Sequence, residues 1–163
     1  MKKHPIALLM ISFVLLTTAF APTAAAQKLS STEGKMSIKF PAEYQASEEG
    51  PTKKFTATVG DQTFFAAYTL HEVELEDLME LAELSLEEFN KILEGNILEK
   101  SNWKVKKNTG LKANIHLIKQ DGKIQYHVIL VGNIQYQVVV ISPTESFDQK
   151  SADKFVKSFK VKK

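Results

Sequence analysis

The chain has 163 residues, 25% of them charged, and its formal net charge is +2. It contains no cysteine, so we expect no disulfide bond, no thiol chemistry and no lipid-modified cysteine at a membrane. It also contains no arginine, the side chain that grips phosphate or guanine with two hydrogen bonds, which argues against a specific nucleic-acid partner.

The first 26 residues have the layout of a secretory signal peptide. Two lysines at the start precede an apolar run over residues 6–16, and the segment closes on the three alanines 24–26. A basic start, an apolar middle and small residues at the end are typical of such peptides. The apolar stretch is shorter than the roughly 20 residues that cross a bilayer, so an uncleaved anchor is the less favoured alternative.

The small residues predict cleavage between Ala26 and Gln27, which leaves residues 27–163 as a single domain. Cleavage after Ala21 is the alternative, although Pro22 would then follow the broken bond. Because two lysines leave with the signal peptide, the remaining chain is neutral, with 19 lysines and 19 acidic residues. We expect a soluble protein that is periplasmic or secreted and has no stable membrane anchor.

The first part of the domain reads as β structure. Residues 27–33 are polar and are expected to be mobile, and the alternating Met36, Ile38 and Phe40 then predict a first strand. Residues 41–51 hold two prolines and three glutamates and are expected to form a surface loop.

A hairpin is predicted next. Residues 55–59 and 63–70 are rich in β-branched and aromatic side chains, and Gly60 and Asp61 between them form a turn that begins with glycine.

From residue 74 to 98 apolar side chains recur every three or four positions with acids between them, which predicts an amphipathic helix. Ser85 and Glu88 match a capping box, so we expect two helices, the first ending near Leu84 and the second near Gly95. We interpret the apolar stripe as the face that docks on the sheet, and its use as a partner-binding helix is the alternative.

Charge is segregated around this helix. Residues 72–99 hold ten acids and one lysine, a net charge of −9, whereas residues 100–163 hold thirteen lysines and four acids, a net charge of +9. We interpret these faces as complementary or solvated; a field that steers a charged partner is the alternative.

Three strands over residues 111–120, 123–131 and 134–141 form the clearest pattern, an antiparallel meander with two-residue turns at Asp121-Gly122 and Gly132-Asn133. A short strand over 103–107 is expected before it.

The chain closes on a helix and a short strand. Pro143 ends the sheet, and Ser146 with Gln149 is expected to cap a final helix. Five apolar residues are expected to face the core: Phe147, Ala152, Phe155, Val156 and Phe159. Residues 160–161 are expected to return as an edge strand.

The two-residue turn at residues 121–122 sets Ile115 opposite Val128 and Leu117 opposite Tyr126. Both faces of the meander are then apolar, so both need a cover. The sequence therefore predicts an α+β fold, a three-layer α/β/α sandwich around a mainly antiparallel sheet.

These elements resemble a known group of proteins. The strand GKMSIKFPAEY, the central helix, the meander and the closing SADKFVKSFKV are together similar to the PsbP/DcrB-like superfamily of small exported domains, over nearly the whole of residues 27–163. Its members include photosystem extrinsic subunits, bacterial envelope proteins and a nuclear transport factor, so the resemblance implies a binding or scaffolding fold with no shared active site. Many DcrB-like members are lipoproteins, and the missing cysteine departs from that pattern.

The two-residue turn at residues 121–122 also places His116 directly opposite His127. The two imidazoles would then be close enough to share a metal ion. A third ligand is lacking, because Asn114, Gln125 and Tyr136 on the same face are poor ones. We therefore name His116, His127 and Tyr136 as weak binding candidates, and stacked sheet histidines as the simpler reading.

Other site chemistries have no motif in the chain. There is no Gly-x-Ser-x-Gly elbow, phosphate-binding glycine loop, calcium loop or dinucleotide fingerprint. The acids of residues 72–88 are interpreted as a solvated helix face rather than a glycosidase pair. The sequence gives no reason to expect an enzyme or a cofactor.

The export signal, the missing catalytic motifs and the superfamily resemblance together favour one hypothesis. In it, the chain is an exported soluble domain of the bacterial cell envelope that binds or scaffolds, holding an envelope protein or a small ligand without catalysis. The alternative is a metal-binding protein with its site at the cross-strand pair His116 and His127. A chaperone or envelope spacer is a variant of the first hypothesis.

Overall fold

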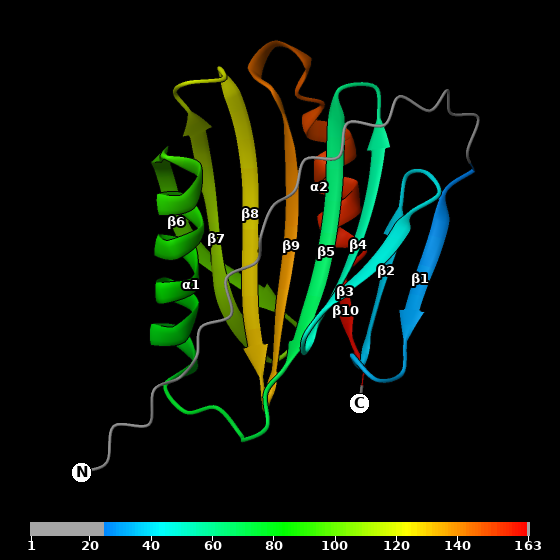
Figure 1. The fold of residues 1–163 in the computed structure, drawn as a ribbon, viewed down its shortest axis with the longest axis vertical. Helices are drawn as coiled ribbons and strands as arrows, with labels where there is room; N and C mark the ends of the chain where they lie inside the picture. The colour runs from blue at the N-terminus through cyan, green and yellow to red at the C-terminus, as the bar shows by residue number, and fades with distance from the viewer. Residues whose placement is uncertain (1–24, 163) are drawn as a thin grey trace.

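The computed structural model describes residues 25–162, so the expected signal peptide lies almost entirely outside the described residues. A seven-stranded sheet in the order β3-β4-β5-β9-β8-β7-β6 forms the body of the domain, and a three-stranded sheet in the order β1-β2-β10 lies beside it (Figure 1). The elements are β1 Gln27–Ser31, β2 Met36–Phe40, β3 Gln45–Glu49, β4 Thr52–Val59, β5 Gln62–Leu70, α1 Leu78–Leu93, β6 Gly95–Val105, β7 Asn108–Leu117, β8 Gly122–Val131, β9 Ile134–Pro143, a 3-10 turn Thr144–Ser146, α2 Gln149–Lys157 and β10 Lys160–Val161.

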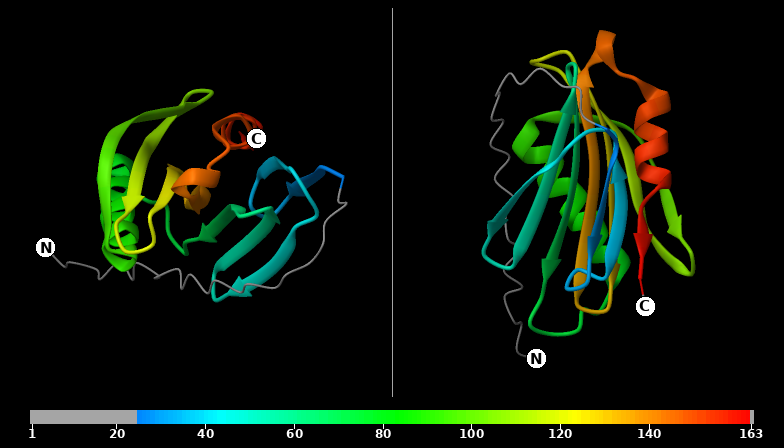
Figure 2. Two further views of the ribbon diagram at one scale, coloured as in Figure 1. Left: turned by 90° about the horizontal axis from the view of Figure 1, so that it is seen from above. Right: turned by 90° about the vertical axis from the view of Figure 1, so that its right-hand side faces the viewer.

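The two helices lie on opposite sides of the large sheet (Figure 2). On one side α1 packs against β6, β7 and β8, and on the other side α2 packs against β9 and β2 of the small sheet. The expected α+β sandwich is confirmed, with the small sheet as an addition to the α2 side. Among residues 25–162 no helix is both long and apolar enough to cross a membrane.

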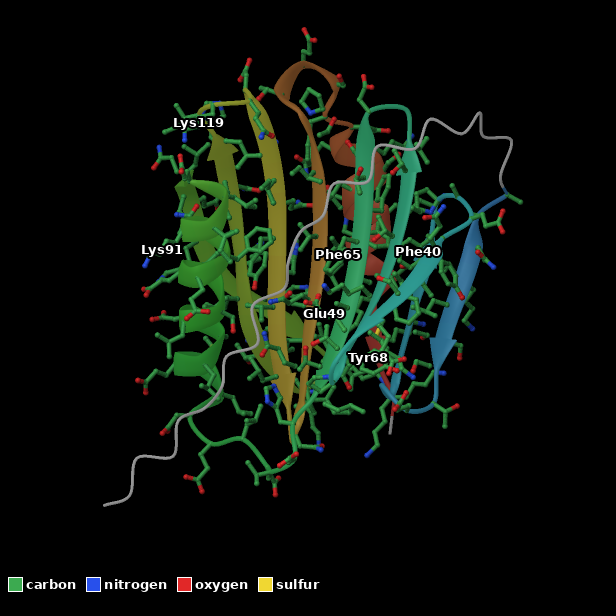
Figure 3. The ribbon with its side chains drawn as sticks, in the orientation of Figure 1. Phe40, Glu49, Phe65, Tyr68, Lys91 and Lys119 are labelled. Atoms are coloured by element: carbon green, nitrogen blue, oxygen red, sulfur yellow. The ribbon has the colours of Figure 1, made fainter. Side chains whose placement is uncertain are left out.

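Each face of the sheet has its own core because neighbouring residues of a strand point to opposite sides. On β5, Phe65 joins the α1-side core with Leu86 and Phe89, whereas Phe64 joins the α2-side core with Phe155. In Figure 3, Phe40 and Tyr68 lie toward the small sheet, while Lys91 extends from α1 toward solvent. The strands of the meander are therefore apolar on both faces, as expected for a covered sheet.

Two segments expected to be irregular are strands. β1 pairs with β2, and its single buried side chain, Leu29, lies opposite Ile38. β3 is exposed at every position and pairs with β4, where Glu48 lies opposite Lys53. Both strands are held by backbone hydrogen bonds to their partners. A strand with few or no buried side chains shows no apolar alternation in the sequence, so the pattern does not predict it.

The expected break within the acidic helix is wrong, because α1 is one helix. The Ser85 hydroxyl donates to the Leu81 carbonyl at 2.7 Å, so it bonds within the helix instead of capping a new one. The helix ends at Glu94, whose φ is 50°. Residues 95–98, expected to be helical, instead begin β6.

The expected register between β7 and β8 is also wrong. β7 ends at Leu117 and β8 begins at Gly122, so the turn has four residues, 118–121, instead of two. Ile115 consequently lies opposite Ile124, not Val128. The turn at Gly132-Asn133 is as predicted, because Val131 pairs with Ile134 across it.

The C-terminal elements lie as predicted, with a different cap. The side chain of Asp148, not Ser146, accepts a hydrogen bond from the Ser151 backbone at 3.1 Å at the start of α2. The short strand β10 then pairs antiparallel with β2, which joins the last residues of the domain to its first sheet.

Candidate functional site

The predicted histidine pair does not exist. His116 lies opposite Lys123 and His127 lies opposite Lys112, because the longer turn moves every partner by four positions. His116 is partly exposed and contacts the Asp121 carboxylate at 3.2 Å. Nowhere in residues 25–162 do three or more His, Cys, Asp or Glu side chains come together as metal ligands. The proposed cross-strand metal site is therefore wrong in its geometry.

The other predicted site residues lie apart from each other. Tyr136 is 1% exposed and packs against Phe159 in the α2-side core, and burial raises the pKa of its hydroxyl to about 12. It is a core residue and offers no accessible binding group. Ala26 and Gln27, at the expected cleavage point, lie at the start of β1, where the Gln27 side chain accepts a hydrogen bond from the Tyr44 backbone. Cleavage there stays a prediction.

The structure does bring together a different group of polar residues, on the α2 side of β6, β7 and β8. Residues directly opposite each other on antiparallel strands share a face, and the strand registers give two adjacent polar rows. We call them the Gln125 row, made of Glu99, Asn114 and Gln125, and the His127 row, made of Ser101, Lys112 and His127.

The two rows line an open hollow. It contains about 270 Å³ of space free of protein atoms, part of it open to solvent. A bulge at Leu98 in β6 sets the register that brings Glu99 opposite Asn114. From α2, Asp153 borders the hollow by accepting a hydrogen bond from Gln125.

His127 is the most buried polar residue of the hollow, with 3% of its surface exposed. Burial, and secondarily the charge of Lys112, lower its pKa from 6.5 to about 4, against the opposing effects of a hydrogen bond to the Val138 backbone and of Asp153. The imidazole is therefore neutral at pH 7. Its Nδ1 atom is buried and has no hydrogen-bond partner. When the single proton of the neutral ring is on the other nitrogen, Nδ1 is an acceptor without a donor.

Gln125 presents a second free acceptor. Its Nε2 atom donates to the Asp153 carboxylate at 3.3 Å, and Gln149 of α2 donates to the same oxygen at 2.8 Å. The Oε1 atom of Gln125 is buried without a partner. The hollow thus combines two unpaired acceptors with two charged residues of opposite sign, Glu99 and Lys112.

The sequence holds a signal for this site that our reading missed. Gln125 and His127 alternate with Ile124, Tyr126 and Val128 in a strand that is covered on both faces, where an apolar residue is expected at each position. Two neighbouring polar side chains on one face of a covered strand indicate that the apolar layer over that face is incomplete there, or that these side chains have a function.

Comparison with known proteins finds solved structures with a similar fold. No family model matches the chain, and no curated protein matches it. The solution structure of cyanobacterial PsbP (CyanoP) from Synechocystis sp. PCC 6803 matches with a TM-score of 0.65 and 10% sequence identity, over 90% of this chain and 98% of that one. A crystal structure from Bacteroides thetaiotaomicron VPI-5482 matches with a TM-score of 0.45 and 14% identity, over 83% of this chain and 48% of the other.

Proposed function

We propose that this chain, which has the PsbP-like fold, is an exported, non-catalytic binding domain of the cell envelope that holds a small polar ligand in the hollow beside α2. The signal-peptide layout of residues 1–26 supports export. The missing cysteine supports release without a lipid anchor. The PsbP-like fold supports a domain built for binding only by analogy, since a fold by itself does not select a function.

The observation that carries the proposal is an open hollow lined by six polar residues of β6, β7 and β8, beside which His127 Nδ1 and Gln125 Oε1 are buried without donors. Leaving a buried acceptor unpaired costs about 1–3 kcal/mol. Structural polar groups in a core are normally paired. Both atoms are out of reach of solvent in this structure, so a ligand removes that cost only by drawing the two side chains toward it.

The size of the hollow limits the ligand. Only about 50 Å³ of it admits the centre of a water-sized sphere, far below the roughly 300–1,000 Å³ of pockets that enclose drug-sized molecules. The ligand is therefore a small molecule, or one unit of a larger molecule that continues into solvent.

Export is tested by producing the full chain in a bacterium and measuring the mass of the protein recovered outside the cytoplasm. We expect the mass of a chain that begins at Gln27. Recovery of the uncleaved chain from the membrane would overturn the export proposal.

Binding is tested by titrating the exported, ¹⁵N-labelled protein with amino acids, small carboxylates, amines and sugars while following its amide signals. We expect at least one compound to shift the amides of the two rows in a saturable way. If the folded protein binds every compound elsewhere or not at all, the hollow is not a ligand site.

A further inference from the structure

The outer face of the small sheet carries lysines and no acidic side chain. Met36, Ile38 and Phe40 of β2 belong to the α2-side core, so the residues between them point away from it. On that outer face, exposed Lys39 lies directly opposite exposed Lys28 of β1. The strands β1, β2 and β10 together contain three lysines and no Asp or Glu. Two like charges therefore face each other across a strand pair, which destabilises a sheet.

Two further lysines at the C-terminal end extend this face. Exposed Lys160 of β10 lies opposite Ser37, two residues along β2 from Lys39. Lys162, just after β10, donates a hydrogen bond to the hydroxyl of Ser30, which lies opposite Ser37 on β1. The positive charges therefore continue across all three strands.

Helix α2 borders the same face. The Lys39 backbone donates to the Ser158 hydroxyl at 2.9 Å, which places that side of the helix beside β2. Exposed Lys154 precedes Ser158 by four residues, so it lies on the same side of the helix. We call these residues together the lysine face: Lys28, Lys39, Lys154, Lys160 and Lys162.

The lysine face has no counter-charge of its own. Among residues 25–162, none of its ammonium groups forms an ion pair. Glu33, in the turn between β1 and β2, pairs with Lys53 of β4 instead. The exposed acids Glu83 and Glu87 belong to α1, on the opposite side of the large sheet (Figure 2). An anionic partner would therefore relieve the repulsion between these lysines.

The lysine face is built for many anions rather than for one. A lysine is a point charge and has no planar fork with which to grip a single phosphate or carboxylate. The Cβ atoms of Lys28 and Lys39 are about 5 Å apart, and Lys160 is diagonal to Lys39 at about 7 Å. The charges are thus spread over strands and helix instead of converging on one point.

The lysine face also lacks what a protein interface needs. The cores of protein interfaces are rich in aromatic residues, methionine and arginine, and poor in lysine. Within residues 25–162, no large apolar side chain that is exposed belongs to β1, β2, α2 or β10. A lipid bilayer does not require such anchors, because lysines alone attract anionic headgroups, each raising the affinity about five-fold.

We infer that the lysine face binds the anionic headgroups of a lipid bilayer, with the small sheet and α2 against the membrane and α1 toward solvent. This contact goes beyond the small-ligand function and uses a different surface. It is electrostatic and reversible, since no apolar side chain enters the bilayer. Repulsion of the acidic α1 from the same headgroups supports this orientation.

The test is cosedimentation of the exported chain with vesicles. One set contains phosphatidylglycerol and phosphatidylcholine in equal parts, and the other contains phosphatidylcholine alone. We expect binding only to the anionic vesicles and its loss as sodium chloride is raised, because salt screens exposed charges. Equal binding to both sets, or binding that salt does not weaken, overturns the inference.

Two double variants with the same net charge decide whether the lysine face is responsible. Lys39→Gln with Lys160→Gln removes two charges from the face, and we expect it to weaken vesicle binding about 25-fold. Lys91→Gln with Lys104→Gln removes two charges from the α1 side and is expected to change binding little. Lys104 belongs to that side because it lies between Trp103 and Val105 of the α2-side core. Equal losses in both variants overturn the inference.

A single substitution guards against a folding defect. Lys28→Gln removes one of the two opposing charges, so we expect it to unfold in urea no earlier than the unmodified protein and to bind vesicles about five-fold more weakly. Unchanged vesicle binding by this variant overturns the inference.

Polyphosphate serves as a soluble polyanion. If it binds and the anionic vesicles do not, the partner is not a membrane and the inference is wrong. Neither result bears on the hollow, which lies on other strands.

Discussion

The imidazole of His127 meets the indole of Trp103 edge to face, with ring centroids 4.9 Å apart and an interplanar angle of 67°. Trp103 is the only tryptophan of the chain, so all tryptophan fluorescence comes from this position. A proton on the imidazole places a full positive charge beside the indole π-system and changes its emission.

We therefore expect the fluorescence of Trp103 to titrate with a midpoint near pH 4, the pKa of buried His127. In His127→Phe the transition is expected to disappear. A midpoint near 6.5, or a transition that persists in the variant, would show that His127 is accessible to solvent or does not contact Trp103.

The same buried imidazole makes stability depend on pH. The pKa of His127 is about 4 in the folded protein against 6.5 ordinarily, so the unfolded chain takes up this proton first as the pH falls. The stabilisation is complete above about pH 6.5 and is lost as the pH falls to about 4, which amounts to about 3 kcal/mol. Lys112 on β7 and Asp153 on α2 are the charges that act on it.

Urea unfolding of the unmodified protein and of His127→Phe at several pH values measures this contribution. The difference between their free energies of unfolding is expected to change between pH 6.5 and 4 and to be constant above that window. A constant difference throughout the window contradicts the buried, neutral imidazole. Carboxylates with lowered pKa values that do not involve His127, such as Asp148, contribute equally to both proteins.

The unpaired Nδ1 atom of His127 also implies that the ligand-free protein is less stable than it need be. We expect His127→Phe to raise the free energy of unfolding at pH 7 by about 1 kcal/mol, because the cost of the unpaired acceptor exceeds the lost bond to Val138. His116→Phe, on the partly exposed neighbour, is the control and is expected to change little. Destabilisation by His127→Phe would show that Nδ1 has a partner in solution.

The strands that carry the polar rows depend on a close approach at Gly110. A Cβ atom there would lie 2.1 Å from the Val128 carbonyl oxygen and 2.8 Å from the Ile129 Cα, both backbone atoms. Gly110→Ala is expected to cost about 1–3 kcal/mol in urea unfolding. Gly122→Ala, where the nearest atom is a Leu117 side-chain carbon at 3.2 Å, should cost clearly less, and equal costs would contradict this packing.

The cap of α2 is tested by two alanine substitutions. Asp148→Ala removes the side chain that accepts from Ser151, and a drop of a few degrees in melting temperature is expected. Ser146→Ala, at the position that the sequence favoured, should have little effect, since its hydroxyl makes only a long contact to Asp61 at 3.4 Å. The reverse order of effects would assign the cap to Ser146.

The sequence predicts those elements whose side chains alternate or recur with a clear period. Met36, Ile38 and Phe40 mark β2, and the glycine turn at residues 60–61 marks the β4–β5 hairpin. β3 was missed because all its side chains are exposed and its partner β4 holds it by backbone bonds. The superfamily resemblance is confirmed as a likeness of fold, at 10% sequence identity.

The site was missed because it depends on register. Asp121-Gly122 is a strong signal for a two-residue turn, but Asp121 takes a φ of 44° as the last residue of a four-residue turn. That change separates His127 from His116 and places it beside Lys112. The bulge at Leu98, equally invisible in the sequence, brings Glu99 into the same face. Small differences in turn and bulge therefore decide which side chains meet.

The most direct test of the account follows the amide signals of the two rows during the titration of the exported chain with small compounds. The account predicts saturable shifts at the amides of Ser101, Asn114, Gln125 and His127 with at least one of the compounds. Unchanged signals at these four amides with every compound, in a protein whose spectrum shows it to be folded, would contradict it.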